Sequence, residues 1–245
     1  MKVLYRQLEV ELKLFLRNKQ EVFFTALFPL LMMSLFGYLN RETSVGDVSY
    51  VAFLLPGIIG MSVMAAAFLN LSTSLVRQRD DGILKRLRGT PLRAWALLGA
   101  KVLAAGTVIL FQVLLLTTVG ILFFGVEIAG SAPWFLATLL VGIFAFTAMG
   151  LALVSLINNA DTASAAAHAV YLPMLFICGT FFPLDVMPRL LQHVAEALPL
   201  TYFVDALRQA MLGGGDLGDY AKDLFILLGW LVCCFAITVK TFRWE

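Results

Sequence analysis

Long apolar runs alternate with short polar segments along most of this chain. A helix needs about 20 apolar residues to cross the hydrocarbon core of a bilayer, and the runs approach that length. We therefore predict an all-α, polytopic membrane protein in which about six helices cross the membrane. Their expected positions are residues 22–39, 50–75, 97–124, 134–157, 162–182 and 224–239.

The stretch ahead of the first apolar run is amphipathic. Between residues 2 and 20, apolar side chains recur at helical spacing and basic side chains stand between them. This pattern is typical of a helix that lies in the membrane interface, which we place at residues 1–21. A soluble helix packed on a partner is the alternative. The charged start does not resemble a cleavable signal peptide, in which an apolar core follows a short basic start at once.

Two segments between the apolar runs are long enough to hold structure of their own. Residues 76–96 are strongly basic, and residues 183–222 contain Pro183, Pro188 and Pro199 with short apolar stretches between them. Prolines interrupt helices, so the second segment predicts short amphipathic helices that are re-entrant or lie at the membrane surface. The whole chain, residues 1–245, is then expected to form a single transmembrane domain.

Composition supports this picture. Hydrophobic residues make up 60% of the 245 residues, charged residues only 14%, and the mean hydropathy is +0.89. A soluble domain of this size needs far more charge to cover its surface, and the apolar runs leave little chain for an appended enzyme. Cys178, Cys233 and Cys234 lack the spacing of metal ligands and are expected to pack as small apolar residues.

The positions of Lys and Arg give the topology a direction. With an even number of spans, fourteen Lys and Arg residues fall on one side of the membrane and four on the other. Basic residues gather on the cytoplasmic side, so we expect both termini and residues 76–96 in the cytoplasm and residues 183–222 outside. The expected location is the inner or plasma membrane of a prokaryotic cell.

The basic segment contains the most informative motif of the chain, at residues 77–91. Ile83, Leu84 and Leu87 form a small apolar stripe among charged residues, and Thr90-Pro91 ends it. A short cytoplasmic helix with an apolar stripe and a charged rim is suited to docking in a groove of a partner protein. The alternative is a solvated loop whose charges serve only to fix the topology.

This stretch resembles the short cytoplasmic motif of the type-2 ATP-binding-cassette exporter permeases, which follows the second span in that family. The matching residues are Asp80, Gly82, Leu84, Leu87, Thr90 and Pro91. Asp80 stands where the family usually has Glu, and Ile83 where it usually has Thr. Residues 181–188 and 198–208 likewise resemble the family's outer segment between its last two spans. The two motifs occur in the family's order within a six-span plan, so the resemblance covers essentially the whole chain.

The resemblance implies a permease that pairs with a second permease, identical or paralogous, in the membrane, each copy contacting one ATPase subunit. The coupling helix that seats in the ATPase would include Asp80, Gly82, Ile83, Leu84, Leu87, Thr90 and Pro91. The chain contains no P-loop, so ATP and Mg would be bound by the partner ATPase, and this chain would carry no cofactor and catalyse no reaction itself. Membrane lipids are expected partners, and nucleic acid is not.

The family resemblance favours export of hydrophobic or amphipathic compounds such as drugs, antibiotics or lipids. An exporter of polysaccharide or lipid-linked glycan is the closest alternative. A membrane-embedded enzyme of lipid metabolism would need clustered Asp, His or Glu at a membrane face, and the sequence pattern offers no such cluster. A membrane scaffold without transport activity is a further alternative.

A translocation path for such cargo should be apolar and adaptable. Candidates for its lining are Phe24, Phe28, Met32, Met61, Met64 and His168. For any one of the apolar residues, packing against other helices or against lipid is the simpler interpretation. His168 follows a run of small residues, so a hydrogen bond to a neighbouring helix competes with contact to cargo.

Overall fold

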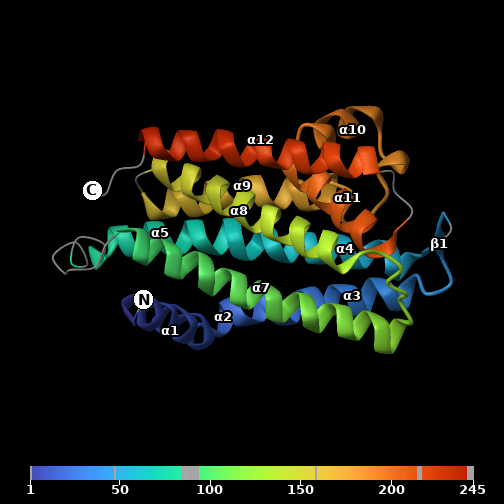
Figure 1. Cartoon of the computed structure of the whole chain (residues 1–245), viewed down its shortest axis with the longest axis horizontal. Helices are drawn as coiled ribbons and strands as arrows, with labels where there is room; N and C mark the ends of the chain where they lie inside the picture. The colour runs from blue at the N-terminus through green and yellow to red at the C-terminus, as the bar shows by residue number, and fades with distance from the viewer. Residues whose placement is uncertain are drawn as a thin grey trace.

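The helices of the chain lie side by side along one axis and form an elongated bundle (Figure 1). This computed structural model describes residues 2–46, 48–83, 86, 94–157, 159–213 and 217–241, with side chains except at 2–4, 20, 21 and 94–98. The start of α1 and the last turns of α5 and α12 lie at one end, which we call the basic end. The short strands and α10 lie at the opposite end.

The described elements follow one another in a simple order. The first part of the chain forms α1 (Lys2–Arg17), α2 (Lys19–Val22), the π-helix η1 (Phe23–Leu27), α3 (Phe28–Leu39), β1 (Ser44–Val45) and β2 (Val48–Ser49). The middle forms α4 (Tyr50–Met64), the π-helix η2 (Ala65–Asn70), α5 (Leu71–Asp80), α7 (Ala94–Phe124) and α8 (Ala132–Leu156). The last part forms α9 (Ala160–Ile177), the 3-10 helix η3 (Leu184–Val186), α10 (Arg189–Glu196), α11 (Pro199–Leu212) and α12 (Leu217–Thr241).

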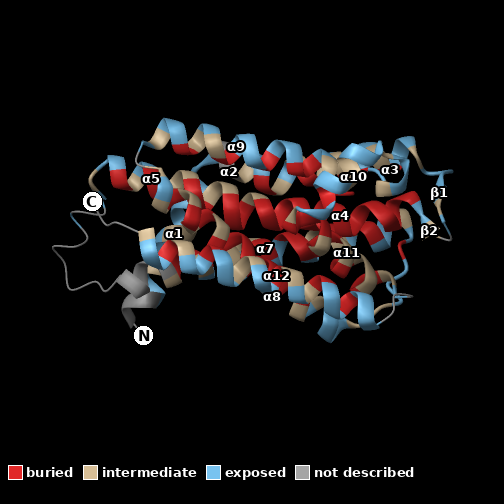
Figure 2. Ribbon diagram, turned by 90° about the horizontal axis from the view of Figure 1, so that it is seen from above, coloured by how far each residue is buried: buried red, intermediate tan, exposed pale blue. Residues whose placement is uncertain are grey.

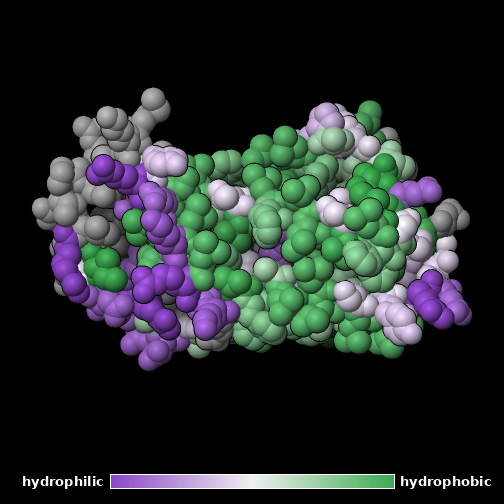
Figure 3. Space-filling model, turned by 90° about the horizontal axis from the view of Figure 1, so that it is seen from below, coloured by the Kyte–Doolittle hydropathy of each residue, from purple (hydrophilic) through white to green (hydrophobic). Residues whose placement is uncertain are grey.

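The expectation of a mostly helical chain with membrane-crossing helices is confirmed at a coarse level. Within the described residues, four helices are long and apolar enough to cross a membrane: Tyr50–Asp80, Gly99–Phe124, Ala132–Leu156 and Leu217–Thr241. The apolar helix Phe23–Leu39 is shorter, and α9 has 18 residues. Figure 3 shows one face of the molecule, on which apolar side chains cover the middle and hydrophilic side chains gather at the basic end. A count of six spans stays a prediction.

Three details differ from the sequence pattern. A short antiparallel pair, β1 with β2, interrupts the otherwise helical chain. The fifth apolar run was expected to be helical to residue 182, but α9 ends at Ile177 because Gly179 takes the left-handed conformation (φ +71°) just beyond its cap. The last helix begins at Leu217 instead of 224, because tertiary contacts satisfy its polar first turns: the Tyr220 hydroxyl donates to the Trp134 carbonyl oxygen over 2.9 Å.

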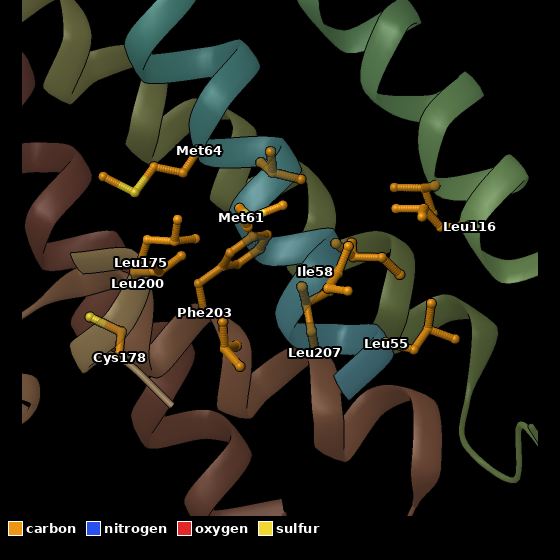
Figure 4. Close-up of a cluster of buried hydrophobic side chains, with 14 of the residues drawn as sticks. Leu55, Ile58, Met61, Met64, Leu116, Leu175, Cys178, Leu200, Phe203 and Leu207 are labelled. Carbon is orange, nitrogen blue, oxygen red and sulfur yellow. The ribbon is translucent and has the colours of Figure 1, made fainter. Parts of the chain in front are cut away.

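Helix α4 forms the centre of the bundle. All 15 of its residues are buried (Figure 2), and it packs against α3, α7, α8 and α11. A helix that is apolar on every face is stable only when every face is covered, which explains why this segment occupies the middle. In the core (Figure 4), Phe203 of α11 lies against α4 and packs edge-to-face on Phe146 of α8, with ring centroids 5.4 Å apart.

The segment 183–222, for which the sequence predicts short helices broken by prolines, holds η3, α10, α11 and the first turns of α12. Pro199 occupies the start of α11, where its missing N–H costs nothing. Arg208 fixes α11 to its surroundings. Its guanidinium donates to Asp205 over 2.8 Å and to the Gly179 carbonyl oxygen over 3.0 Å. The guanidinium carbon Cζ lies 4.0 Å from the centre of the Phe53 ring. Helix α11 is therefore built into the bundle, whereas α10 buries only Ala195.

Candidate functional site

The candidate site begins where α5 ends, at the basic end. Helix α5 continues from α4 through η2, so Tyr50–Asp80 is one rod of 31 residues. The Asp81 and Gly82 amides donate to the carbonyl oxygens of Arg77 (2.9 Å) and Arg79 (3.0 Å), and Gly82 has φ +68°. This is the left-handed helix stop that glycine adopts without strain. The left-handed backbone conformation at this position thus explains why the motif has a glycine there.

We expect Gly82→Ala to loosen this stop by about 1 kcal/mol, because a Cβ atom disfavours the left-handed conformation. Hydrogen exchange measures this loosening. The amides of residues 81 and 82 should exchange about fivefold faster, because 1 kcal/mol corresponds to about a fivefold change in the opening equilibrium. Gly82→Asn is the control, since Asn tolerates this conformation and should change exchange less. Equal exchange in the Ala variant and the parent protein would contradict the account.

Arg79, the penultimate residue of α5, turns back into the bundle. It is 9% exposed, and its guanidinium donates to the carbonyl oxygens of Val154 (3.3 Å) and Ile157 at the end of α8. The last carbonyl groups of a helix have no partners within the helix. A cation at this position satisfies them and also complements the negative end of the helix dipole.

Asp80 makes the complementary contact to the next helix. Its carboxylate Oδ2 accepts a hydrogen bond of 2.8 Å from the backbone N–H of Ala160, in the first turn of α9. The Asn159 side chain accepts from Thr162 N–H over 3.0 Å in the same turn, so two side chains cap α9. Asp80, the first of the residues that match the family motif, therefore makes its contact within this chain, to α9.

A second polar contact at the basic end joins α1 to α5 and α7. The Lys101 ammonium lies 3.1 Å from the Glu11 carboxylate and 3.2 Å from the Ser74 hydroxyl, and both charged side chains are nearly buried, at 3% and 11% exposure. A cavity of about 70 Å³ adjoins this pair, lined also by Phe15 and Asn70. In the sequence, Lys101 lies within the apolar run predicted to span residues 97–124. A lysine inside an apolar run needs a buried partner for its charge, so this position in the sequence could have predicted one.

The surface of α1 carries a different kind of pair. Lys13 lies 2.6 Å from Glu9, one turn away, and both side chains are more than half exposed. The hydrogen bond and charge of Lys13 hold the pKa of Glu9 below its ordinary value. Such an exposed pair contributes little to stability, in contrast to Glu11 and Lys101.

The structure describes part of the predicted coupling residues. Asp80, Gly82 and Ile83 are described, and the Ile83 side chain is 36% exposed. The Arg86 guanidinium donates to the Asp81 carbonyl oxygen over 2.8 Å. Leu84, Leu87, Thr90 and Pro91 lie outside the described residues.

The residues proposed for a translocation path do not lie together on one surface. Met61 and Met64 are at most 1% exposed and sit in the core of Figure 4 near Leu175 and Phe203, whereas Phe24 is 54% exposed. Phe28 and Met32 are half-buried. A path along all of these residues would need a rearrangement of the core.

His168 lies on an exposed face of α9. Its ring Nδ1 is 2.7 Å from the Ser164 carbonyl oxygen of the same helix. This contact lies within α9, and a hydrogen bond from His168 to a neighbouring helix stays a prediction. In the described part of the chain, no three His, Cys, Asp or Glu residues are grouped so as to hold a metal ion.

Comparison with known proteins gives the site its context. The sequence profile of ABC-2 type transporters matches residues 5–212. The probable multidrug ABC transporter permease YbhR of Escherichia coli K12 is 26% identical over 182 residues, which are 74% of this chain and 50% of YbhR. The present chain thus spans about half the length of that relative.

Two further relatives are matched over more of their length. The putative transport permease YvfS of Bacillus subtilis 168 is 24% identical over 234 residues, which are 95% of this chain and 94% of YvfS. Nodulation protein J of Rhizobium leguminosarum bv. trifolii is 30% identical over 209 residues, which are 81% of this chain and 76% of the relative.

Proposed function

This chain belongs to the ABC-2 type transporter family, and from that premise we propose that it is the transmembrane permease subunit of an ATP-driven exporter. The proposed cargo is a hydrophobic or amphipathic compound, such as a drug, an antibiotic or a lipid, moved out of the cell. A separate ATPase subunit binds ATP and Mg and supplies the energy. The observation that carries the proposal is the family match over residues 5–212, and the apolar surface of the bundle supports it.

In the proposed arrangement, about six helices cross the inner or plasma membrane of a prokaryote, with the basic end in the cytoplasm. The excess of Lys and Arg at that end supports this orientation. Residues 76–96 then face the ATPase, and α10 and α11 face the outer side. A second permease copy, identical or paralogous, completes the transporter.

The proposed coupling helix uses the apolar stripe of Ile83, Leu84 and Leu87 to seat in a groove of the ATPase. The rod Tyr50–Asp80 supports this role, because it runs without a break from the motif to the far end of the bundle. In this proposal, a displacement of the motif moves the whole rod. The cargo is proposed to move along apolar surfaces that include Phe24, Phe28 and Met32, which are at least partly exposed.

The test is co-purification and transport with the partner ATPase, whose gene we expect beside that of this chain. Leu87→Asp should weaken binding of the ATPase by about thirtyfold or more, because a carboxylate replaces an apolar side chain at the centre of the contact. ATP-driven efflux of a hydrophobic dye from reconstituted vesicles should fall in parallel. Leu84→Asp should act in the same way.

Leu87→Met is the matched control, because it keeps an apolar side chain of similar volume and should bind and transport like the parent protein. If the Asp variants bind and transport normally, the coupling-helix assignment is wrong. If the parent complex hydrolyses ATP without moving a dye, a lipid or a lipid-linked glycan, the exporter proposal is wrong.

A further inference from the structure

Two adjacent residues at the end of α5 hold the two helices on either side of the α8–α9 turn. Arg79 donates to the carbonyl oxygens of Val154 (3.3 Å) and Ile157, where α8 ends. Asp80 accepts from Ala160 N–H over 2.8 Å, where α9 begins. One dipeptide therefore binds the end of one helix and the start of the next, which are 75 to 80 residues away in sequence.

The charges of the pair match the helix ends that they contact. The end of a helix carries partial negative charge on its free carbonyl groups, and the start carries partial positive charge on its free amides. Arg79 brings a cation to the first and Asp80 an anion to the second. Exchanging the two residues would place each charge at the wrong helix end, so their order has an electrostatic reason.

The stretch that follows α9 is also attached to the rod Tyr50–Asp80, at the opposite end of the bundle. The Tyr50 hydroxyl donates to the Phe181 carbonyl oxygen over 2.9 Å. The rod also approaches this stretch closely at Gly57, where an added Cβ would lie 2.3 Å from the Thr180 carbonyl oxygen. The rod is thus attached to the start of α9 at one end and to the stretch just after α9 at the other.

We infer that Arg79 and Asp80 are positioning residues that attach the α8–α9 turn to the coupling motif, so that ATP-driven displacement of the motif moves α9 together with α5. The inference rests on the proposed function and deepens it. It assigns Asp80, which the family motif places in the contact with the ATPase, to a contact within its own chain. The residues that touch the ATPase then begin after the helix stop at Gly82.

The decisive measurement is the amount of cargo moved per ATP hydrolysed by the reconstituted complex. Asp80→Ala should lower this ratio about fivefold or more, the effect of losing one helix cap, while the ATPase still co-purifies. Asp80→Asn should restore most of the ratio, because the amide oxygen can still accept from Ala160 N–H. Asp81→Ala is the matched control: its exposed side chain has the same charge one residue further on, and its ratio should equal that of the parent protein.

A second readout separates coupling from folding. In the parent complex, ATP binding should change hydrogen exchange both at residues 77–83 and in the first turn of α9. In Asp80→Ala, the ATP-dependent change should remain at residues 77–83 and disappear from α9. A purely structural role would alter exchange equally with and without ATP and leave the cargo-to-ATP ratio unchanged, and that result would overturn the inference.

Two other results would also overturn it. If Asp80→Ala weakens ATPase binding as strongly as Leu87→Asp, and the bound complexes keep a normal cargo-to-ATP ratio, Asp80 contacts the ATPase. If Asp81→Ala uncouples as strongly as Asp80→Ala, the contact with α9 is not the cause. A parent complex without transport would instead defeat the proposed function, so the two failures are distinguishable.

Discussion

Replacing Lys101 with Met is expected to lower the free energy of unfolding by about 3–5 kcal/mol, because it leaves the Glu11 carboxylate buried without its cation. The two groups lie 3.1 Å apart, at 3% and 11% exposure. Chemical unfolding of the purified protein in mixed detergent micelles measures the loss. Because Glu11 belongs to α1, the loss should include detachment of α1 from α7, visible as faster hydrogen exchange along α1.

The double variant Glu11→Leu with Lys101→Met distinguishes burial of a charge from loss of packing. It removes both charges, and replacing a whole buried pair by apolar side chains is often nearly neutral. We expect it to recover most of the lost stability. Lys13→Met is the control on the same helix, since its pair with Glu9 is exposed to solvent and its loss should leave the stability nearly unchanged. A Lys101 variant as stable as the parent protein would show that the pair is not a structural contact.

The second large effect is expected from Gly142→Ala in α8. An added Cβ would lie 2.1 Å from Cε2 of Phe203, far inside contact distance. Phe203 is fully buried and its ring packs on Phe146, so it has little room to move. Overpacking of this kind lowers the free energy of unfolding by about 1–3 kcal/mol, and we expect the upper part of that range.

Gly106→Ala is the matched control, because a Cβ at this helical position meets nothing within 4 Å. It should be neutral or stabilising by up to about 1 kcal/mol, since Ala favours helix over Gly. Phe203→Leu should restore part of the stability of Gly142→Ala by making room for the new methyl group. Thermal unfolding followed by size-exclusion chromatography measures all three. Equal stability of the Gly142 and Gly106 variants would contradict the close contact.

Hydropathy alone predicted where most of the helices lie, because apolar runs of this length have few other stable arrangements. It failed where helix ends depend on contacts between distant residues. The start of α12 carries polar residues that a hydropathy window excludes, yet Tyr220 reaches Trp134 and Asp223 accepts from Gln209 over 3.2 Å. The end of α9 was extended too far because its glycine stop lies within an otherwise apolar run.

The sequence alone identified which residues belong to the candidate site, but not which residues they contact. The motif identified Asp80 and Gly82 through their spacing, and Gly82 follows the local rule for a helix stop. The partners of Arg79 and Asp80 lie on α8 and α9, and no periodicity in a single sequence pairs residues so far apart. The same limit concealed the contact of Lys101 with Glu11, 90 residues away in sequence.

The complete burial of α4 has an evolutionary consequence. A helix with no free face cannot change one side chain without a matching change in a neighbour, so single substitutions in α4 are expected to be rejected more often than those in α3 or α9. In the proposed exporter, the exposed positions near Phe24 in η1 and His168 in α9 can therefore vary while the rod that carries the motif stays the same. The positions free to vary and the helix that carries the motif then lie in separate parts of one small chain.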